Sequence, residues 1–342
     1  MLSAVTGRFA TGPVPFHFDL TNLQFLTTVP LLVGADVFIH DRLRVLVPEF
    51  LDRDLVAVED RSRFDGFIAR ALHLRNSCIA EVALFLIAFT VGYWLWRRYS
   101  SLHVASWYMV PAGAGVGAMQ LTGAGCWLAF VSLPISRFIL LRWYFRLFIW
   151  HLFLWRVSRL RLALNPLHVD RAGGLGFLVN SSTAFGPVLV AQSIFFATLV
   201  GSEIWHAGAR LSDFRYEIVA LVALLLLFVL FPLTFFAGQL NDARLRGTRR
   251  YGRLASRYTN AFEKKWLSAG EGPGEPLLGT SDIQSLSDLA NSYDVVRGMR
   301  LFPFDKTTIA RLAILVVLPL LPLAFTTIPL DKLLRAVVNV FV

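Results

Sequence analysis

The chain has 342 residues, of which 56% are hydrophobic and only 16% are charged, and its formal net charge at pH 7 is +10. Soluble domains usually carry about 25% charged residues, so this composition and the mean hydropathy of +0.58 exclude an ordinary soluble protein. The apolar runs do not alternate with polar residues, as the strands of a membrane β-barrel do. We therefore expect an all-α integral membrane protein.

Six apolar stretches are long enough to cross a hydrocarbon core, which takes about 17 to 25 helical residues. These predicted spans are Leu23–Ile39, Ile79–Trp96, Thr122–Leu141, Ala184–Val200, Ile218–Ala237 and Ile309–Pro329. Five of them contain at least one proline. Because proline removes a backbone hydrogen bond, we expect kinked helices at these positions.

Basic residues concentrate on alternate connections between the spans. If the amino terminus lies outside, the inner segments 41–77, 137–171 and 239–311 hold 26 of the 33 Lys and Arg residues. Cytoplasmic connections of membrane proteins are enriched in these residues. The sequence therefore predicts both termini in the periplasm of a bacterial inner-membrane protein and residues 239–306 in the cytoplasm, and the same bias explains the net charge without nucleic acid as a partner.

This topology divides the chain into three parts. Residues 1–238 form the first part of the transmembrane domain, with cytoplasmic helices expected in 41–77 and in 142–164. The second of these helices continues the third span. Residues 307–342 supply the last span and a short outer tail.

The cytoplasmic region 239–306 is expected to contain two helices. The first is basic and runs from about Asn241 to Trp266. The second begins at Ser281-Asp282-Ile283-Gln284, which matches a capping box, in which serine and glutamine side chains satisfy reciprocal backbone donors.

Charged residues inside or at the ends of the spans are functional candidates because they are costly to place in lipid. Two interpretations are open: a structural cluster of ion pairs, or the inner mouth of a conduit. The residues concerned are Asp36, Glu81, Arg137 and Arg311, joined by Arg142 and Arg146 where the third span continues.

A glycine-rich loop before the fourth span forms a second candidate. Three glycines in four residues permit a tight turn, and two readings remain: structural pinning of the loop, or ligand sensing and gating. Its residues are His168, Asp170, Arg171, Gly173 and Gly174. We predict no catalytic residue, metal site or cofactor, and the cysteines Cys78 and Cys126 are expected to stay unpaired.

The loop 168–177, the stretch Ser281–Leu289 and the stretch Val295–Phe304 together resemble a family of uncharacterised bacterial inner-membrane proteins. Members tend to read His-Pro-Asp-Arg-Ala-Gly-Gly at the loop, where this chain has Val169 in place of proline. The resemblance covers most of the chain and implies location and a six-span architecture, but no activity.

Three functions are open. The leading hypothesis is a homo-oligomeric channel or a transporter for a small ion, with anions slightly favoured because arginines outnumber carboxylates at the candidate site. The alternative is a scaffold or sensor that docks a partner through residues 239–306, whose basic helix is also suited to anionic lipid headgroups. A membrane enzyme acting on lipid is less favoured, because no catalytic motif stands out. The expected partners are the lipid bilayer and further copies of the chain.

Overall fold

A computed structural model describes residues 20–95, 107–111, 119–267 and 280–325. These residues are almost entirely helical, and their two strands form one short antiparallel hairpin, β1 (Met109–Pro111) with β2 (Met119–Leu121). The expected all-α architecture is therefore confirmed for the described part of the chain. The two termini and the Gly/Pro-rich connection 270–276 lie outside the described residues.

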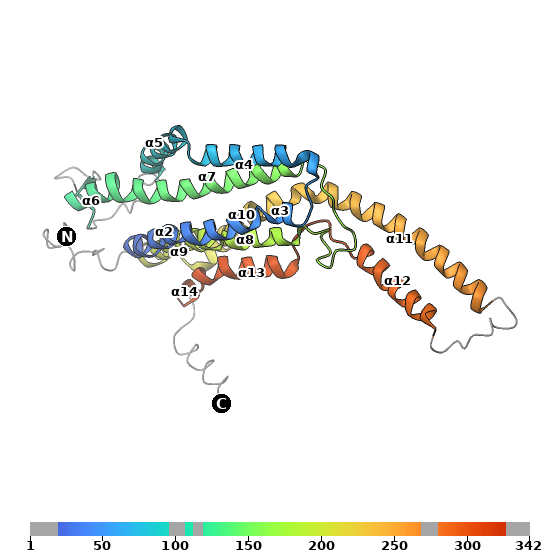
Figure 1. The fold of residues 1–342 in the computed structure, drawn as a ribbon. Helices are drawn as coiled ribbons and strands as arrows, with labels where there is room; N and C mark the ends of the chain where they lie inside the picture. The colour runs from blue at the N-terminus through green and yellow to red at the C-terminus, as the bar shows by residue number, and fades with distance from the viewer. Residues whose placement is uncertain (1–19, 96–106, 112–118, 268–279, 326–342) are drawn as a thin grey trace, which may run out of the picture.

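Long helices form a bundle (Figure 1). In this bundle, α2 packs along α9. Both α4 and α5 pack along α7, and α13 packs against α9 and α10. The bundle helices are α2 (Leu20–Leu46), α4 (Arg61–Arg75), α5 (Cys78–Leu95), α7 (Leu133–Val157), α9 (Gly186–Ala207), α10 (Arg215–Leu230) and α13 (Lys306–Val317).

Shorter helical segments connect or extend the long ones. They are α3 (Glu49–Asp52), η2 (Val58–Asp60), α6 (Gly123–Trp127), η4 (Leu128–Ser132), η5 (Leu175–Leu178), α8 (Val179–Ala184), η6 (Leu211–Phe214), η7 (Phe231–Phe236), η8 (Leu318–Leu320) and α14 (Leu321–Ala324). Prolines mark several of these changes of helix type. The π-helical η4 precedes Pro134, and Pro232 and Pro319 lie at the starts of the 3-10 segments η7 and η8. A missing N–H explains such local changes.

Four continuous helical runs are long and apolar enough to cross a membrane. They are Gly123–Val157, Leu175–Trp205, Leu211–Trp266 and Lys306–Ala324. The pair Val58–Arg75 and Cys78–Gly92, bent by 45°, makes a fifth if it counts as one span. Among the described residues, these four or five runs identify the chain as a membrane protein. The predicted first span lies on α2, which is not among these runs.

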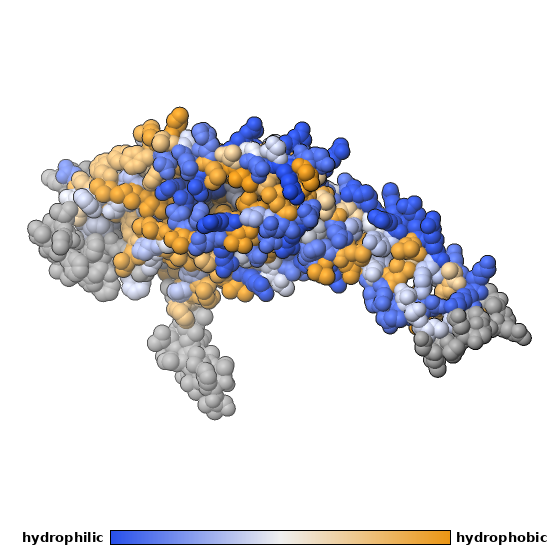
Figure 2. Space-filling model, in the orientation of Figure 1, coloured by the Kyte–Doolittle hydropathy of each residue, from blue (hydrophilic) through white to orange (hydrophobic). Residues whose placement is uncertain are grey.

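The surface of the bundle agrees with contact to lipid. On α5, Ile79, Val82 and Leu86 are largely exposed, as are Val219 and Leu224 on α10. Figure 2 shows hydrophobic residues over the end of the molecule near α5 and α6, whereas hydrophilic residues cover α4 and α11. Apolar patches of this extent are expected where a protein faces lipid rather than water.

The end of the bundle around α3, α4 and η5 is held by an aromatic core. Phe50 lies 5.6 Å from Phe64 and 5.1 Å from Phe177 between ring centroids, and Phe153 of α7 packs against the first two. Edge-on contacts of this kind stabilise beyond the area that they bury. The core fixes α4 against the second half of α7.

Helix α7 continues the third predicted span without interruption, as expected, but it ends at Val157 rather than near residue 164. The carbonyl groups just past its end have a partner distant in sequence. The Gln239 side-chain amide donates hydrogen bonds to the carbonyl oxygens of Ser158 (2.6 Å) and Leu160 (2.8 Å). This side chain thus satisfies acceptors just beyond the end of the helix.

Helices α11 (Ala237–Trp266) and α12 (Ser281–Arg297) form a hairpin that projects from one end of the bundle (Figure 1). The predicted basic helix is confirmed and starts four residues earlier. The capping box is wrong, because Thr280 is the N-cap residue and the Gln284 amide donates instead to Asp288 Oδ1 at 2.9 Å.

Gly247 of α11 lies where the hairpin crosses the loop after α7. A Cβ atom there would lie 2.7 Å from Pro166 Cβ and 2.9 Å from Val296 Cγ1. We expect Gly247→Ala to weaken the docking of α12 by about 1–3 kcal/mol, as overpacking does. Hydrogen exchange of the α12 amides, measured by mass spectrometry, will report the loss of protection.

Gly238→Ala is the matched control on the same helix. A Cβ atom at Gly238 meets nothing within 4 Å, and alanine favours a helix over glycine by up to about 1 kcal/mol. Equal protection of α12 in the two variants would contradict the tight crossing at Gly247.

Candidate functional site

Four of the six charged residues predicted from the spans lie together between α2, α5 and α7. Arg146 pairs with both carboxylate oxygens of Asp36, its Nη2 lying 3.2 Å from Oδ2. One turn earlier on α7, Arg142 Nη2 lies 3.5 Å from Glu81 Oε1. Because residues four apart share a helix face, α7 is joined to α2 and to α5 through adjacent arginines.

The other two predicted residues lie elsewhere. The Arg137 side chain packs beneath Gly92 of α5, where an added Cβ would come within 2.9 Å of its Cδ. Its Nε is buried without a hydrogen-bond partner among the described residues. Arg311 is exposed on α13 and does not line the cavities described below. The expectation that Arg311 joins the polar group is therefore not met.

Two adjoining cavities open beside these ion pairs. One, of about 360 Å³, lies between α2, α4 and α7; the other, of about 440 Å³, reaches the start of α5. They share Asp36, His40, Arg75 and Arg146 as lining residues. Figure 2 shows this face hollowed between α2 and α4, with hydrophilic residues on the rim. We refer to the two together as the α2–α4–α7 cavity.

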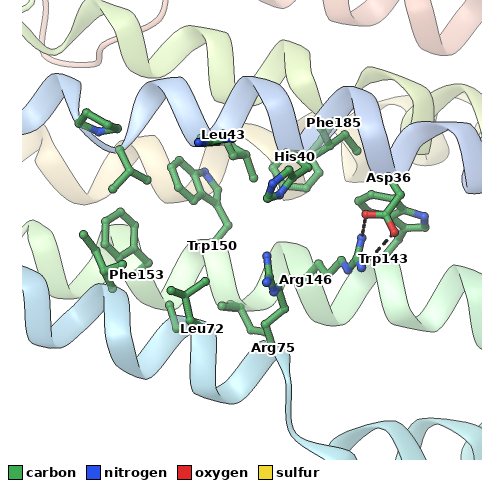
Figure 3. A pocket seen from close by; sticks show the side chains of 17 residues that line it. Asp36, His40, Leu43, Leu72, Arg75, Trp143, Arg146, Trp150, Phe153 and Phe185 are labelled. Carbon is green, nitrogen blue, oxygen red and sulfur yellow. Dashed lines mark hydrogen bonds and ion pairs between the residues drawn. The ribbon is translucent and has the colours of Figure 1, made fainter.

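Polarity changes along the cavity. In Figure 3, His40, Arg75 and Arg146 lie toward the end marked by the Asp36–Arg146 pair, whereas Trp150 and Phe153 lie toward the other end. The apolar part is lined by Ile39, Leu43, Val47, Ile68, Leu72, Ile149, Trp150 and Phe153. The charged part is lined by Asp36, His40, Arg75, Asn76, Glu81, Arg142 and Arg146.

The lining carries an excess of positive charge. Arg44, Arg75, Arg142 and Arg146 face two carboxylates, which leaves a formal charge of +2 with His40 neutral. The two ion pairs neutralise Arg142 and Arg146. Arg75 Nε donates to the Asn76 side chain at 3.2 Å and has no carboxylate partner among the described residues. Arg75 lines both cavities, so it can pair with an anion that enters either of them.

Sequence reasoning missed His40, Arg44 and Arg75. They belong to ordinary polar stretches, and the contact between α4 and the second half of α7 that brings Arg75 to the site is tertiary. One signal was available for Arg75: the polar run Arg75-Asn76-Ser77 ends one helix and precedes the apolar run of α5. A helix break beside a span is where the chain can bring a charge to the bundle.

The glycine-rich loop is held by its own aspartate. The Asp170 carboxylate accepts hydrogen bonds from the backbone N–H groups of Ala172 (2.8 Å), Gly174 (3.2 Å) and Gly176 (2.8 Å), and His168 Nδ1 lies 2.8 Å from it. Burial raises the pKa of Asp170, but these donors and the nearby imidazole outweigh it, so the pKa lies below its ordinary value.

Backbone conformation explains the glycines of this loop. Gly173 and Gly174 have φ values of 65° and 100°, and Arg171 shares the left-handed region at 53°. Arg300 then ties the loop to the connection after α12: its backbone N–H donates to the Arg171 carbonyl (2.7 Å) and its guanidinium to the Asp170 carbonyl (3.1 Å). Of the two interpretations, this geometry favours structural pinning, and we refer to the loop as the Asp170 clasp.

The described residues define a polytopic helical membrane protein with a charged and partly apolar cavity in its bundle. No model of a protein family matches the chain, and comparisons with curated proteins and with solved structures found no match. Among the described residues no group of three or more His, Cys, Asp or Glu is arranged to hold a metal ion. Cys78 and Cys126 are unpaired, as expected.

Asp170→Asn tests the clasp. The amide can accept with one oxygen only, and its NH₂ group then meets a backbone N–H, so we expect a loss of about 1–3 kcal/mol in the free energy of unfolding at neutral pH. Thermal unfolding of the purified protein will show it. Asp65→Asn, at an exposed position of α4 without a hydrogen-bond or ion-pair partner among the described residues, is the control.

The effect depends on pH in a defined direction. Because the folded-state pKa of Asp170 is lowered, its contribution is fully present above the unfolded value of about 4 and is lost as the pH falls through the folded value. The difference in the free energy of unfolding between wild type and Asp170→Asn should therefore become smaller at acidic pH. A difference that is constant down to acidic pH would contradict this role of the carboxylate.

Proposed function

We propose that this protein is a membrane transporter for anions and that the α2–α4–α7 cavity is its binding site. The observation that carries the proposal is the charge of the lining, in which four arginines face two carboxylates. In a site bordered by apolar helices, the sign of the lining determines which ions enter. The same cavity disfavours cations, because an entering cation meets Arg75 without a carboxylate beside it.

In this proposal six helices cross a bacterial inner membrane, with α2 as the first. Leu26, Val33 and Val37 of α2 are largely exposed, as expected for a face turned to lipid, and its other side packs along α9. The excess of basic residues in 41–77, 137–171 and 239–311 supports a cytoplasmic position for the end that carries the α11–α12 hairpin. The cavity then opens near the cytoplasmic side.

The bend between α4 and α5 supports a mechanism for access. The two helices meet at 45° across a short break, and Arg75 and Asn76 at this break line the cavity. A hinge formed by a few residues at the end of a helix can absorb a change in direction. An anion that pairs with Arg75 and competes with Glu81 for Arg142 would change the contacts that hold α5 against α7.

A homo-oligomeric channel is the variant of this proposal that the sequence suggested. It requires copies of the chain to surround a common pore, whereas a carrier needs only the cavity within one chain. Images of single particles in lipid distinguish them: a ring with an axial opening favours the channel, and a monomer favours the carrier.

A second candidate is a sensor or scaffold that docks an acidic partner through the α11–α12 hairpin. The hairpin projects beyond the bundle (Figure 1), and exposed arginines on α11 give it a basic surface. These arginines include Arg246, Arg249, Arg250, Arg253 and Arg257. Wild-type protein without anion flux would make this candidate the preferred one.

Arg75→Gln tests transport. The purified protein in liposomes should take up anions, and we expect the variant to lose about tenfold or more in uptake, since a hydrogen bond to a charged group contributes about 1.5–3 kcal/mol. Arg311→Gln is the matched control, because it removes the same charge from an exposed position outside the cavity. Equal flux in the two variants, or no flux in the wild type for any of a range of anions, would overturn the proposal.

A further inference from the structure

We propose that the α2–α4–α7 cavity takes an amphipathic anion, with a single alkyl or acyl chain in its apolar part and a carboxylate or phosphate group at Arg75, Arg142 and Arg146. This inference rests on the proposed function and adds the class of substrate. The observation that supports it is that charged residues line one end of the cavity and apolar residues line the other (Figure 3).

A small inorganic ion accounts for only one end of this cavity. The other end is lined by Leu43, Val47, Ile68, Leu72 and Phe153, with Arg44 next to Leu43 as its charged member, and the apolar side chains offer nothing to a hydrated ion. Protein interiors are close-packed, with few voids larger than a water molecule. An ordered water in a cavity needs two or more polar groups as hydrogen-bond partners, and these apolar side chains supply none. The apolar part is therefore suited to a hydrocarbon group.

One polar atom in the wall has no partner. Trp150 lines the cavity and is 6% exposed, and its indole Nε1 has no hydrogen-bond partner among the described residues. Buried donors are satisfied in most proteins, but this N–H is enclosed by protein and an alkyl chain offers it no acceptor, so Trp150 contributes to the site as an apolar wall. The neighbouring Trp143, by contrast, donates from Nε1 to the Leu32 carbonyl at 3.0 Å.

The charged end matches an anionic headgroup. Guanidinium groups bind carboxylate and phosphate through two parallel hydrogen bonds. Arg142 and Arg146 are held in place by Glu81 and Asp36, while Arg75 reaches the same space from α4 (Figure 3). His40 lines both cavities and adds a further donor.

The volume selects one chain rather than two. The apolar cavity measures about 360 Å³, and a methylene group occupies about as much space as a water molecule, roughly 30 Å³. Because Asp36, His40, Arg75 and Arg146 line the same volume and the headgroup takes part of it, a chain of about ten to twelve carbons is the upper limit. The total volume lies in the ordinary range of small-molecule sites.

Binding of n-alkyl phosphates of four to fourteen carbons tests the inference. The full-length protein in nanodiscs of zwitterionic lipid is titrated by calorimetry, with empty nanodiscs subtracted. Each methylene that enters the cavity contributes about 0.8 kcal/mol, so affinity should rise about fourfold per carbon and then level off at or before about ten to twelve. An increase that never levels off, or no increase above empty nanodiscs, would overturn it.

Two substitutions separate the ends of the ligand. Arg75→Gln should weaken binding about tenfold at every chain length, because it removes a contact to the headgroup. Leu72→Trp should shorten the chain length at which affinity levels off and leave the shortest phosphates unaffected. Val45→Trp, on the exposed side of α2 and outside the cavity lining, is its control. A Leu72→Trp profile identical to that of Val45→Trp would contradict a chain in this cavity.

A bilayer lipid and a free amphiphile share this chemistry. Native mass spectrometry after reconstitution with phosphatidylglycerol or with a single-chain alkyl phosphate distinguishes the sources, since retention that Arg75→Gln abolishes identifies the ligand. The outcomes also separate the two proposals. Arg75-dependent flux of inorganic anions without chain-length dependence leaves transport standing and refutes the amphipathic substrate, whereas Arg75-dependent binding without flux refutes transport alone.

Discussion

The need to pair Arg142 and Arg146 of α7 organises the site. A guanidinium between apolar helices is costly unless a carboxylate neutralises it, and Arg146 meets this need with Asp36 while Arg142 meets it with Glu81. The partners lie on different helices, so the same requirement joins α2 and α5 to α7. In the turn between the two arginines, Trp143 adds a hydrogen bond to the backbone of α2.

Past the two ion pairs, toward the second half of α7, other interactions hold the bundle together. The Phe50–Phe64–Phe153–Phe177 core fixes the second half of α7, Gln239 bonds the carbonyl groups past its end, and the Asp170 clasp binds the connection to α13 through Arg300. The cavity lies between the ion pairs and the aromatic core. It is bordered by two fixed regions, and α4 closes its side up to the bend at Asn76.

Periodicity and apolar length predicted the helices, because helix formation in lipid depends on local sequence. Charge inside a span was a sufficient signal for Asp36, and charge on the continuation of a span was sufficient for Arg146. The rest depends on contacts between distant segments: Arg75 reaches the site through tertiary packing of α4, and α7 ends where Gln239 supplies hydrogen bonds from α11. The predicted capping box is wrong for a local reason, because the Gln284 amide donates a hydrogen bond to Asp288 one turn along the helix instead.

The apolar wall and the charged end strengthen each other. Attraction between a guanidinium and an anion rises as the surrounding dielectric falls, so an alkyl chain that fills the apolar part also excludes water from Arg75 and Arg146. The headgroup in turn fixes one end of the chain, which limits the freedom that the rest loses on binding. A cavity with these two ends adjoining thus favours one molecule carrying both groups over an ion and a hydrocarbon bound separately.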